Sequence, residues 1–168
     1  MPASDRLRVL ITDGNTRAAL AATRSLGQHG HYVVVGDAGP APLARASRFS
    51  AAGLVYPDPA VDEAGFLWTV RDAVRRHQID VLVPIADIAM MVITEARHEF
   101  EPACRVPFPD AARVARAGDK AAVTRLAESL SIPIPRTLIL ETAGSLASVE
   151  GLAFPIVVVR RAEQDPDA

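Results

Sequence analysis

The hydrophobic positions of the first hundred residues alternate between short apolar runs and longer stretches with helical spacing. The apolar runs at 8–12, 32–35 and 79–84 are rich in β-branched residues, and a glycine, proline or aspartate ends or follows each of them. Continuous apolar runs of this length predict strands that are buried on both faces of a sheet. A briefer strand is expected at 54–56, after a loop-like stretch rich in proline, glycine and alanine.

Between these runs the apolar residues recur at the spacing of amphipathic helices. The pattern covers 16–29, where Asn15 or Thr16 can be the N-cap, and it returns over 62–77 and 87–100. Strand, helix and strand in succession predict right-handed βαβ units, because parallel neighbours need a crossover connection. The sequence therefore predicts an α/β fold with a Rossmann-like, parallel, doubly wound sheet.

The pattern changes near residue 118, which is the first plausible domain boundary. Prolines at 133 and 135 exclude a helix there, because each proline pushes the residue before it to extended geometry. The elements expected beyond residue 109 are helices at 110–117, 120–131 and 143–150 and strands at 136–140 and 155–159. We expect residues 1–117 to form one domain and residues 118–168 to be the incomplete beginning of another.

Composition and charge exclude several classes of function. Hydrophobic residues make up 49% of the 168 residues, which is enough for a core. No apolar run approaches the roughly 18 to 20 residues of a membrane-spanning helix, and the first residues do not resemble a signal peptide. The 18 Lys and Arg residues are scattered among 20 Asp and Glu residues, so nucleic-acid binding is not expected. We expect a cytoplasmic protein that binds neither membrane nor nucleic acid.

Thiol and imidazole groups offer no site. Cys104 is the only cysteine, so neither an internal disulfide nor a paired metal site can form, and we expect a buried or idle thiol. None of the histidines has a partner at the spacing of a metal site or a catalytic triad. The histidines are His29, His31, His77 and His98. We predict no metal ligand and no catalytic residue in this chain.

The polar residues after the strands are the candidate ligand contacts, because ligands of a doubly wound sheet bind at the carboxyl ends of its strands. After the first strand come Gly14, Asn15 and Arg17, with one glycine where a dinucleotide fingerprint has three. An NAD or FAD site is therefore not expected. Asp87 follows the fourth strand and can be either a helix N-cap or a ligand contact. Asp37 can form a turn or contact a sugar hydroxyl, and the turn is the preferred interpretation.

Two basic residues further along the chain suit phosphate groups. Lys120 opens a helix, where a cation is unfavourable to the helix dipole unless it faces solvent or an anion. Arg160 follows the apolar run at 156–159, and the forked donors of a guanidinium match phosphate oxygens. A solvated surface position is the alternative explanation for each of them.

Several segments, taken in order, carry a resemblance to a known family. They are 9–14, 80–84, Gly118-Asp119-Lys120, 126–127, 132–137 and 154–159. Their order and spacing resemble the ATP-grasp superfamily, and within it the carbamoyl-phosphate-synthase-like and carboxylate–amine ligase branches. The resemblance implies a pre-ATP-grasp domain over residues 1–117 and the opening of the ATP-grasp domain over residues 118–168.

The same resemblance implies a partial nucleotide site. Lys120 matches a lysine that contacts nucleotide phosphates in this family. A second basic contact lies where this chain has Val159, with Arg160 one place later. The resemblance implies ATP and Mg²⁺ as cofactors of the complete enzyme, and it places the glycine-rich loop and the magnesium carboxylates beyond this sequence. We therefore expect no tightly bound cofactor and no turnover from the chain alone.

Three hypotheses of function follow. The first is the N-terminal fragment of an ATP-dependent carboxylate–amine ligase with an acyl-phosphate mechanism, in which Gly14, Asn15, Arg17 and Asp87 contact a small-molecule carboxylate or amine substrate. The alternative is a non-catalytic Rossmann-like module that binds a ligand or another protein. A fragment of a nicotinamide-dependent oxidoreductase or epimerase ranks last, because the glycines are missing. A homodimer is possible through either of the first two helices.

Overall fold

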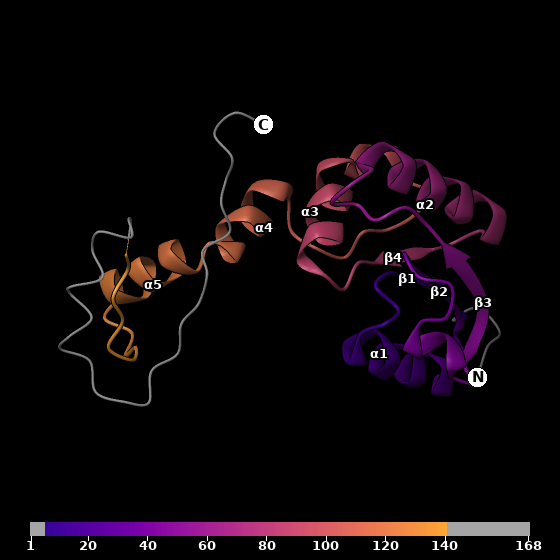
Figure 1. Cartoon of the computed structure of the whole chain (residues 1–168), viewed down its shortest axis with the longest axis horizontal. Helices are drawn as coiled ribbons and strands as arrows, with labels where there is room; N and C mark the ends of the chain where they lie inside the picture. Colours follow the sequence, from indigo (N-terminus) through magenta and orange to yellow (C-terminus); the bar gives the residue numbers. More distant parts are fainter. Residues whose placement is uncertain (1–5, 141–168) are drawn as a thin grey trace. The chain divides into compact units, whose positions relative to one another are not determined.

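A computed structural model describes residues 6–140 of the chain (Figure 1). The chain divides into two units, Met1–Val114 and Ala115–Ala168, which are described separately. The first unit contains a parallel four-stranded sheet with helices on both faces. The predicted α/β fold class is confirmed.

The strands of the sheet lie in the order β3-β2-β1-β4. Their bounds are Arg8–Ile11 for β1, Tyr32–Asp37 for β2, Ser50–Val55 for β3 and Val81–Val83 for β4. β1 pairs with β2 on one side and with β4 on the other. The chain thus builds the sheet outward in one direction through β3 and then crosses to the other side of β1, so the switch point lies between β1 and β4.

Alternate residues of each central strand are buried on opposite faces. Leu10 and Val34 belong to the larger core, which they share with α2 and α3. Val9 and Val33 belong to the smaller core, which they share with α1 and the short 3-10 helix Leu43–Ala46. In Figure 1, α1 lies on one side of the sheet, and α2 and α3 lie on the other. The helices are α1 Arg17–Gln28, α2 Glu63–His77, α3 Asp87–Glu95, α4 Ala111–Gly118 and α5 Lys120–Ser129.

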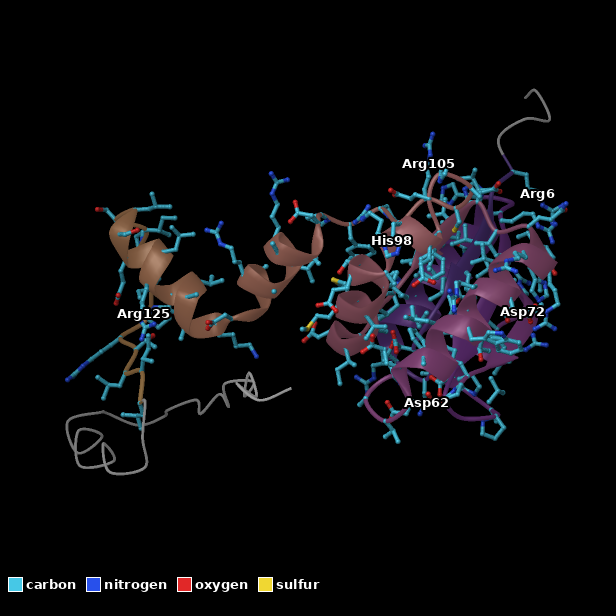
Figure 2. The ribbon with its side chains drawn as sticks, turned by 90° about the horizontal axis from the view of Figure 1, so that it is seen from above. Arg6, Asp62, Asp72, His98, Arg105 and Arg125 are labelled. Atoms are coloured by element: carbon cyan, nitrogen blue, oxygen red, sulfur yellow. The ribbon has the colours of Figure 1, made fainter. Side chains whose placement is uncertain are left out.

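Side-chain caps set the beginnings of the first two helices. The Thr16 hydroxyl accepts a hydrogen bond from the Ala19 N–H at 3.1 Å, so Thr16 rather than Asn15 is the N-cap of α1. The Asp62 carboxylate, labelled in Figure 2, accepts from the Gly65 N–H at 2.8 Å at the start of α2. Each of these bonds satisfies an N–H group that has no partner within its helix.

Three predicted elements differ from the structure. β3 begins at Ser50, four residues earlier than predicted, because β2 supplies a hydrogen-bonding partner for small residues that carry little apolar signal of their own. α3 ends at Glu95, and the 3-10 turn Arg97–Glu99 replaces the rest of the helix predicted to residue 100. Residues 136–140 form no strand. A strand needs a hydrogen-bonded neighbour, and the predicted strand at 155–159 lies outside the described residues.

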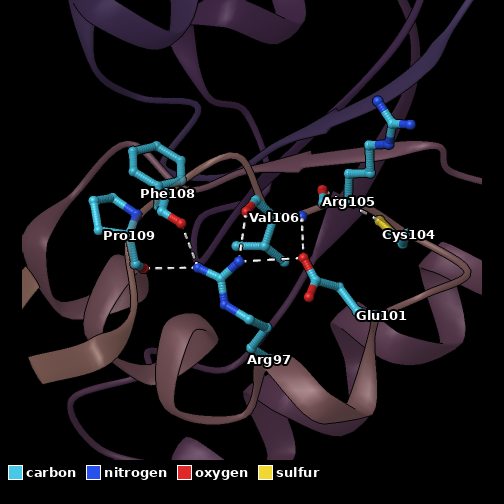
Figure 3. A network of polar contacts seen from close by, with 7 residues as sticks. All are labelled: Arg97, Glu101, Cys104, Arg105, Val106, Phe108 and Pro109. Carbon is cyan, nitrogen blue, oxygen red and sulfur yellow. Dashed lines mark hydrogen bonds and ion pairs between the residues drawn. The ribbon is translucent and has the colours of Figure 1, made fainter. Parts of the chain in front are cut away.

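Arg97 holds the segment that leads from α3 toward α4 (Figure 3). Its guanidinium donates hydrogen bonds to the carbonyl oxygens of Val106 at 2.9 Å, Phe108 at 2.5 Å and Pro109 at 2.7 Å. It also pairs with the Glu101 carboxylate at 3.2 Å. The planar, forked donors of arginine suit such a convergent set of acceptors. This segment is therefore part of the first unit.

The structure describes residues 115–140 of the second unit. α4 runs across the division between the units, and α5 follows with Asp119 as its N-cap. The Asp119 carboxylate accepts from the N–H groups of Ala121 and Ala122, at 2.9 and 3.0 Å. Neither α4 nor α5 buries a side chain among the described residues. The predicted domain boundary at 117/118 stays a prediction.

Candidate functional site

Asp13 lies at the switch point of the sheet, two residues after the end of β1. Its Oδ2 atom accepts hydrogen bonds from the backbone N–H groups of Ala86 at 2.8 Å and Ile85 at 3.1 Å. The Thr12 hydroxyl donates to the same oxygen at 2.5 Å. Asp13 has a φ of 55°, in the left-handed region that few residues other than glycine, asparagine and aspartate adopt. These bonds tie the end of β1 to the beginning of α3.

Tyr56 supports this turn through its hydroxyl group. Its hydroxyl oxygen accepts from the Asp13 N–H at 2.8 Å, and its O–H lies 3.4 Å from the Gly36 carbonyl oxygen, to which it donates. The Tyr56 ring is 3% exposed and packs edge-on against Phe66. Burial raises the pKa of Tyr56 well above its ordinary value, so the hydroxyl stays protonated and acts as a fixed hydrogen-bonding group.

Close packing at the same edge of the sheet leaves room only for a glycine at position 14. A Cβ atom at this position would lie 2.5 Å from Cγ1 of Val35, a separation that side chains do not tolerate. Its N–H donates to the Gly36 carbonyl at 3.0 Å, and its own carbonyl accepts from the Ala44 N–H at 2.8 Å. The backbone of Gly14 is therefore used within the fold, and its predicted contact with substrate stays a prediction.

Asn15 and Asp37 join the turns that follow β1 and β2. The Asp37 carboxylate accepts from the Asn15 N–H at 2.8 Å and from the Gly39 N–H at 2.8 Å. The Asn15 side-chain oxygen accepts from the Leu43 N–H at 3.3 Å. The interpretation of Asp37 as a turn-forming residue is confirmed, because each of its carboxylate oxygens binds a backbone N–H. Asn15 is exposed, so its side chain faces solvent at this edge.

Arg17 and Asp87 are the first residues of α1 and α3 and are both exposed. Because α1 follows β1 and α3 follows β4, both helices begin at the carboxyl edge of the sheet. The N-cap of α3 is Ala86, so the interpretation of Asp87 as the N-cap is wrong. Its carboxylate lies in the first turn instead, where a negative charge interacts favourably with the helix dipole. The role of Asp87 as a ligand contact stays a prediction.

The candidate phosphate contacts belong to the second unit. Lys120 is the exposed first residue of α5 and directly follows the capping carboxylate of Asp119. Arg160 lies outside the described residues. Within residues 6–140, no group of three His, Cys, Asp or Glu side chains is arranged to hold a metal ion.

Cys104, His29 and His98 lie outside the group of residues at the sheet edge. Cys104 is buried, and burial, with the nearby charges of Asp80 and Glu101, raises the pKa of its thiol to about 12. The thiol is therefore protonated and unreactive at neutral pH. His98 lies at the surface (Figure 2), and the His29 ring pairs with the Ser25 carbonyl of its own helix. Asp13 and Tyr56 are the residues at the sheet edge that sequence reasoning missed.

None of the helices within residues 6–140 has the length and apolar character that a membrane crossing requires.

Comparison with known proteins gives a match in structure without one in sequence. No family model and no curated protein matches the sequence. N5-carboxyaminoimidazole ribonucleotide synthetase from Thermotoga maritima is similar over 89% of this chain, with a TM-score of 0.58 and 18% identity. L-amino acid ligase from Bacillus licheniformis is similar over 90%, with a TM-score of 0.62 and 14% identity. N5-carboxyaminoimidazole synthetase from Staphylococcus aureus, complexed with ADP, is similar over 94%, with a TM-score of 0.58 and 15% identity.

These similarities are partial with respect to the other proteins. This chain spans 37%, 36% and 39% of the lengths of the three enzymes. At such low identity the comparison establishes the fold and leaves activity and substrates to be tested. The chain has the fold of the N-terminal part of the ATP-grasp carboxylate–amine ligases, as the resemblance in its sequence implied.

Proposed function

We propose that this chain is the N-terminal portion of an ATP-dependent carboxylate–amine ligase. In such an enzyme ATP phosphorylates a carboxylate, and an amine then displaces the phosphate. The observation that carries the proposal is the extent of the structural similarity. The first unit ends at residue 114 of 168, about two thirds of the chain, so a match over 89% also includes residues of the second unit. A generic Rossmann-like module would be expected to match through its sheet alone.

In this proposal the sheet edge supplies the substrate side of the site. Arg17 is exposed at the start of α1, where its guanidinium can pair with a substrate carboxylate. Asp87 is exposed at the start of α3, where its carboxylate can pair with an amine. Gly14 and Asn15 shape the turn between β1 and α1. The small-molecule substrate would thus lie across the carboxyl ends of β1 and β4.

The second unit would supply part of the nucleotide site. Lys120, with Arg160, would contact the phosphates of ATP, and Mg²⁺ would neutralise the transferring phosphoryl group in the complete enzyme. The exposure of Lys120 leaves its ammonium accessible to a ligand. The neighbouring Asp119 is occupied by the N–H groups of Ala121 and Ala122 in capping α5.

Isothermal titration of the purified chain with magnesium and ATP tests this proposal. Lys120→Ala should weaken binding by about tenfold or more, the loss expected for one hydrogen bond between charged groups. Arg116→Ala is the matched control, because Arg116 is an exposed cation of the preceding helix and alanine preserves the helix. Equal binding by wild type and Lys120→Ala would remove Lys120 from the nucleotide site. Absence of binding in all three proteins would contradict a phosphate contact in this part of the chain.

A further inference from the structure

The beginning of α3 has backbone donors that are satisfied from a distant part of the chain. The helix has nine residues, and its N-cap, Ala86, provides no side-chain cap. N–H groups at the start of a helix point outward along its axis and together attract negative charge. Here the N–H groups of Ala86, which is the N-cap, and of Ile85, which precedes it, both donate to the Asp13 carboxylate, 73 and 72 residues earlier in the sequence.

Asp13 is held so that its carboxylate stays in this position. Its N–H donates to the Tyr56 hydroxyl, and its carbonyl accepts from both the N–H and the hydroxyl of Thr16, at 3.0 and 2.9 Å. Both polar groups of its backbone are thus bound. The residue is also half-buried, so water screens its charge incompletely. A second anion placed at the same N–H groups would be excluded sterically, because the Asp13 side chain already fills that position.

We propose that Asp13 is the specificity-determining residue of this sheet edge, because its carboxylate occupies the position that a phosphate or carboxylate of a ligand would take between β1 and α3. The inference rests on the proposed function and narrows it. The part of the substrate that enters the switch point is uncharged or cationic, and an anionic part must bind elsewhere along the edge, such as at Arg17. The Asp13 carboxylate would likewise keep nucleotide phosphates from binding between β1 and α3.

Two substitutions test whether the Asp13 side chain excludes anions by filling the position or by its charge. Asp13→Gly removes the carboxylate, which leaves the Ala86 N–H without its partner and the Ile85 N–H with only the Thr12 hydroxyl at 3.3 Å. Glycine adopts the positive φ of this position without strain. Asp13→Asn removes the charge but retains the shape, the side-chain oxygen and a tolerance for the left-handed region. If occupancy excludes anions, the asparagine variant behaves like the wild type.

The experiment is a titration of the full chain with inorganic phosphate, in which NMR follows the amide signals of Ile85 and Ala86. Asp13→Gly should show saturable shifts at these amides, and wild type and Asp13→Asn should bind at least about tenfold more weakly. Wild-type binding as tight as that of Asp13→Gly would overturn the proposal. An absence of shifts in folded Asp13→Gly would also overturn the proposal. Tight binding of phosphate by Asp13→Asn would overturn it as well.

Hydrogen exchange of the wild-type protein provides a test that does not depend on a variant folding. The Ala86 amide should exchange slowly, because Asp13 holds it in a hydrogen bond within the fold. Exchange at the rate of a freely exposed amide would overturn the proposal. These readouts are independent of the Lys120 titration with ATP, so a failure of this inference can be distinguished from a failure of the proposed function.

Discussion

In α2 of the first unit, Phe66 and Val70 are fully buried against the sheet, whereas in α5 of the second unit Val123 and Leu126 are 45% and 49% exposed. Both helices show apolar residues at the spacing of an amphipathic helix. The difference is that α2 packs against a sheet, while in the described part of the chain no side chain of α5 is buried. The same sequence pattern thus leads to a core in one region and to an exposed face in the other.

This contrast indicates where the stability of the protein lies. An amphipathic pattern predicts that a helix forms when its apolar face is covered, and most of the stability then comes from that burial. The first unit satisfies this requirement with its own residues. Substitutions in the two regions should therefore differ in cost even when the side chains removed are similar.

Truncation of a core side chain is the strongest test of the contrast. Phe66→Ala should lower the free energy of unfolding by about 3 to 5 kcal/mol, because it removes a fully buried ring that also packs against Tyr56. Leu126→Ala in α5 should cost less than about 1 kcal/mol, because the side chain is already half exposed and alanine favours a helix. Denaturation by urea, followed by circular dichroism, measures both. A loss at Leu126 as large as that at Phe66 would mean that α5 is covered in solution.

Replacing a glycine by alanine in each region is a second test of the contrast between packed and exposed positions. Gly14→Ala should destabilise the protein by about 1 to 3 kcal/mol, because its Cβ would collide with Val35. Gly118→Ala is the matched control. No atom lies within 4 Å of a Cβ there, and the position is helical, so the change should be neutral or stabilising by up to about 1 kcal/mol. Midpoints of thermal unfolding rank the two variants, and a reversed order would contradict the packing assigned to the Gly14 turn.

The smallest expected effect concerns the segment between α3 and α4. Arg97→Ala should cost about 1 to 2 kcal/mol, because three carbonyl groups lose a charged donor but water can replace part of it at this partly exposed site. Arg97→Lys should restore little of the lost stability. A single ammonium group lacks the planar, forked donors with which the guanidinium binds the three carbonyl oxygens together. Faster hydrogen exchange in residues 105–110 would accompany the loss. Unchanged exchange there would show that Arg97 does not fix this segment.

The sequence predicted the positions of strands and helices well where the spacing of apolar residues matches the residues that the fold buries. β1, β2 and the two helices α1 and α2 were predicted close to their observed positions, because apolar runs and amphipathic spacing are local signals. β3 was predicted too short, since its small residues join the sheet through backbone pairing with β2. The rule that ligands bind at the carboxyl ends of strands directed attention to the turn that contains Gly14 and Asn15, although their contact with substrate remains to be tested.

What the sequence determined by itself was the order of elements, the parallel class of the sheet and the turns at its carboxyl edge, because each depends on neighbouring residues. Only the tertiary structure decided that the Asp13 carboxylate accepts from the N–H groups just before α3 and that the Tyr56 hydroxyl binds the Asp13 N–H. These hydrogen bonds join residues 73 and 43 positions apart. A carboxylate and a distant N–H leave no local pattern in the chain, and they meet because strand pairing places β4 beside β1 and β3 beside β2.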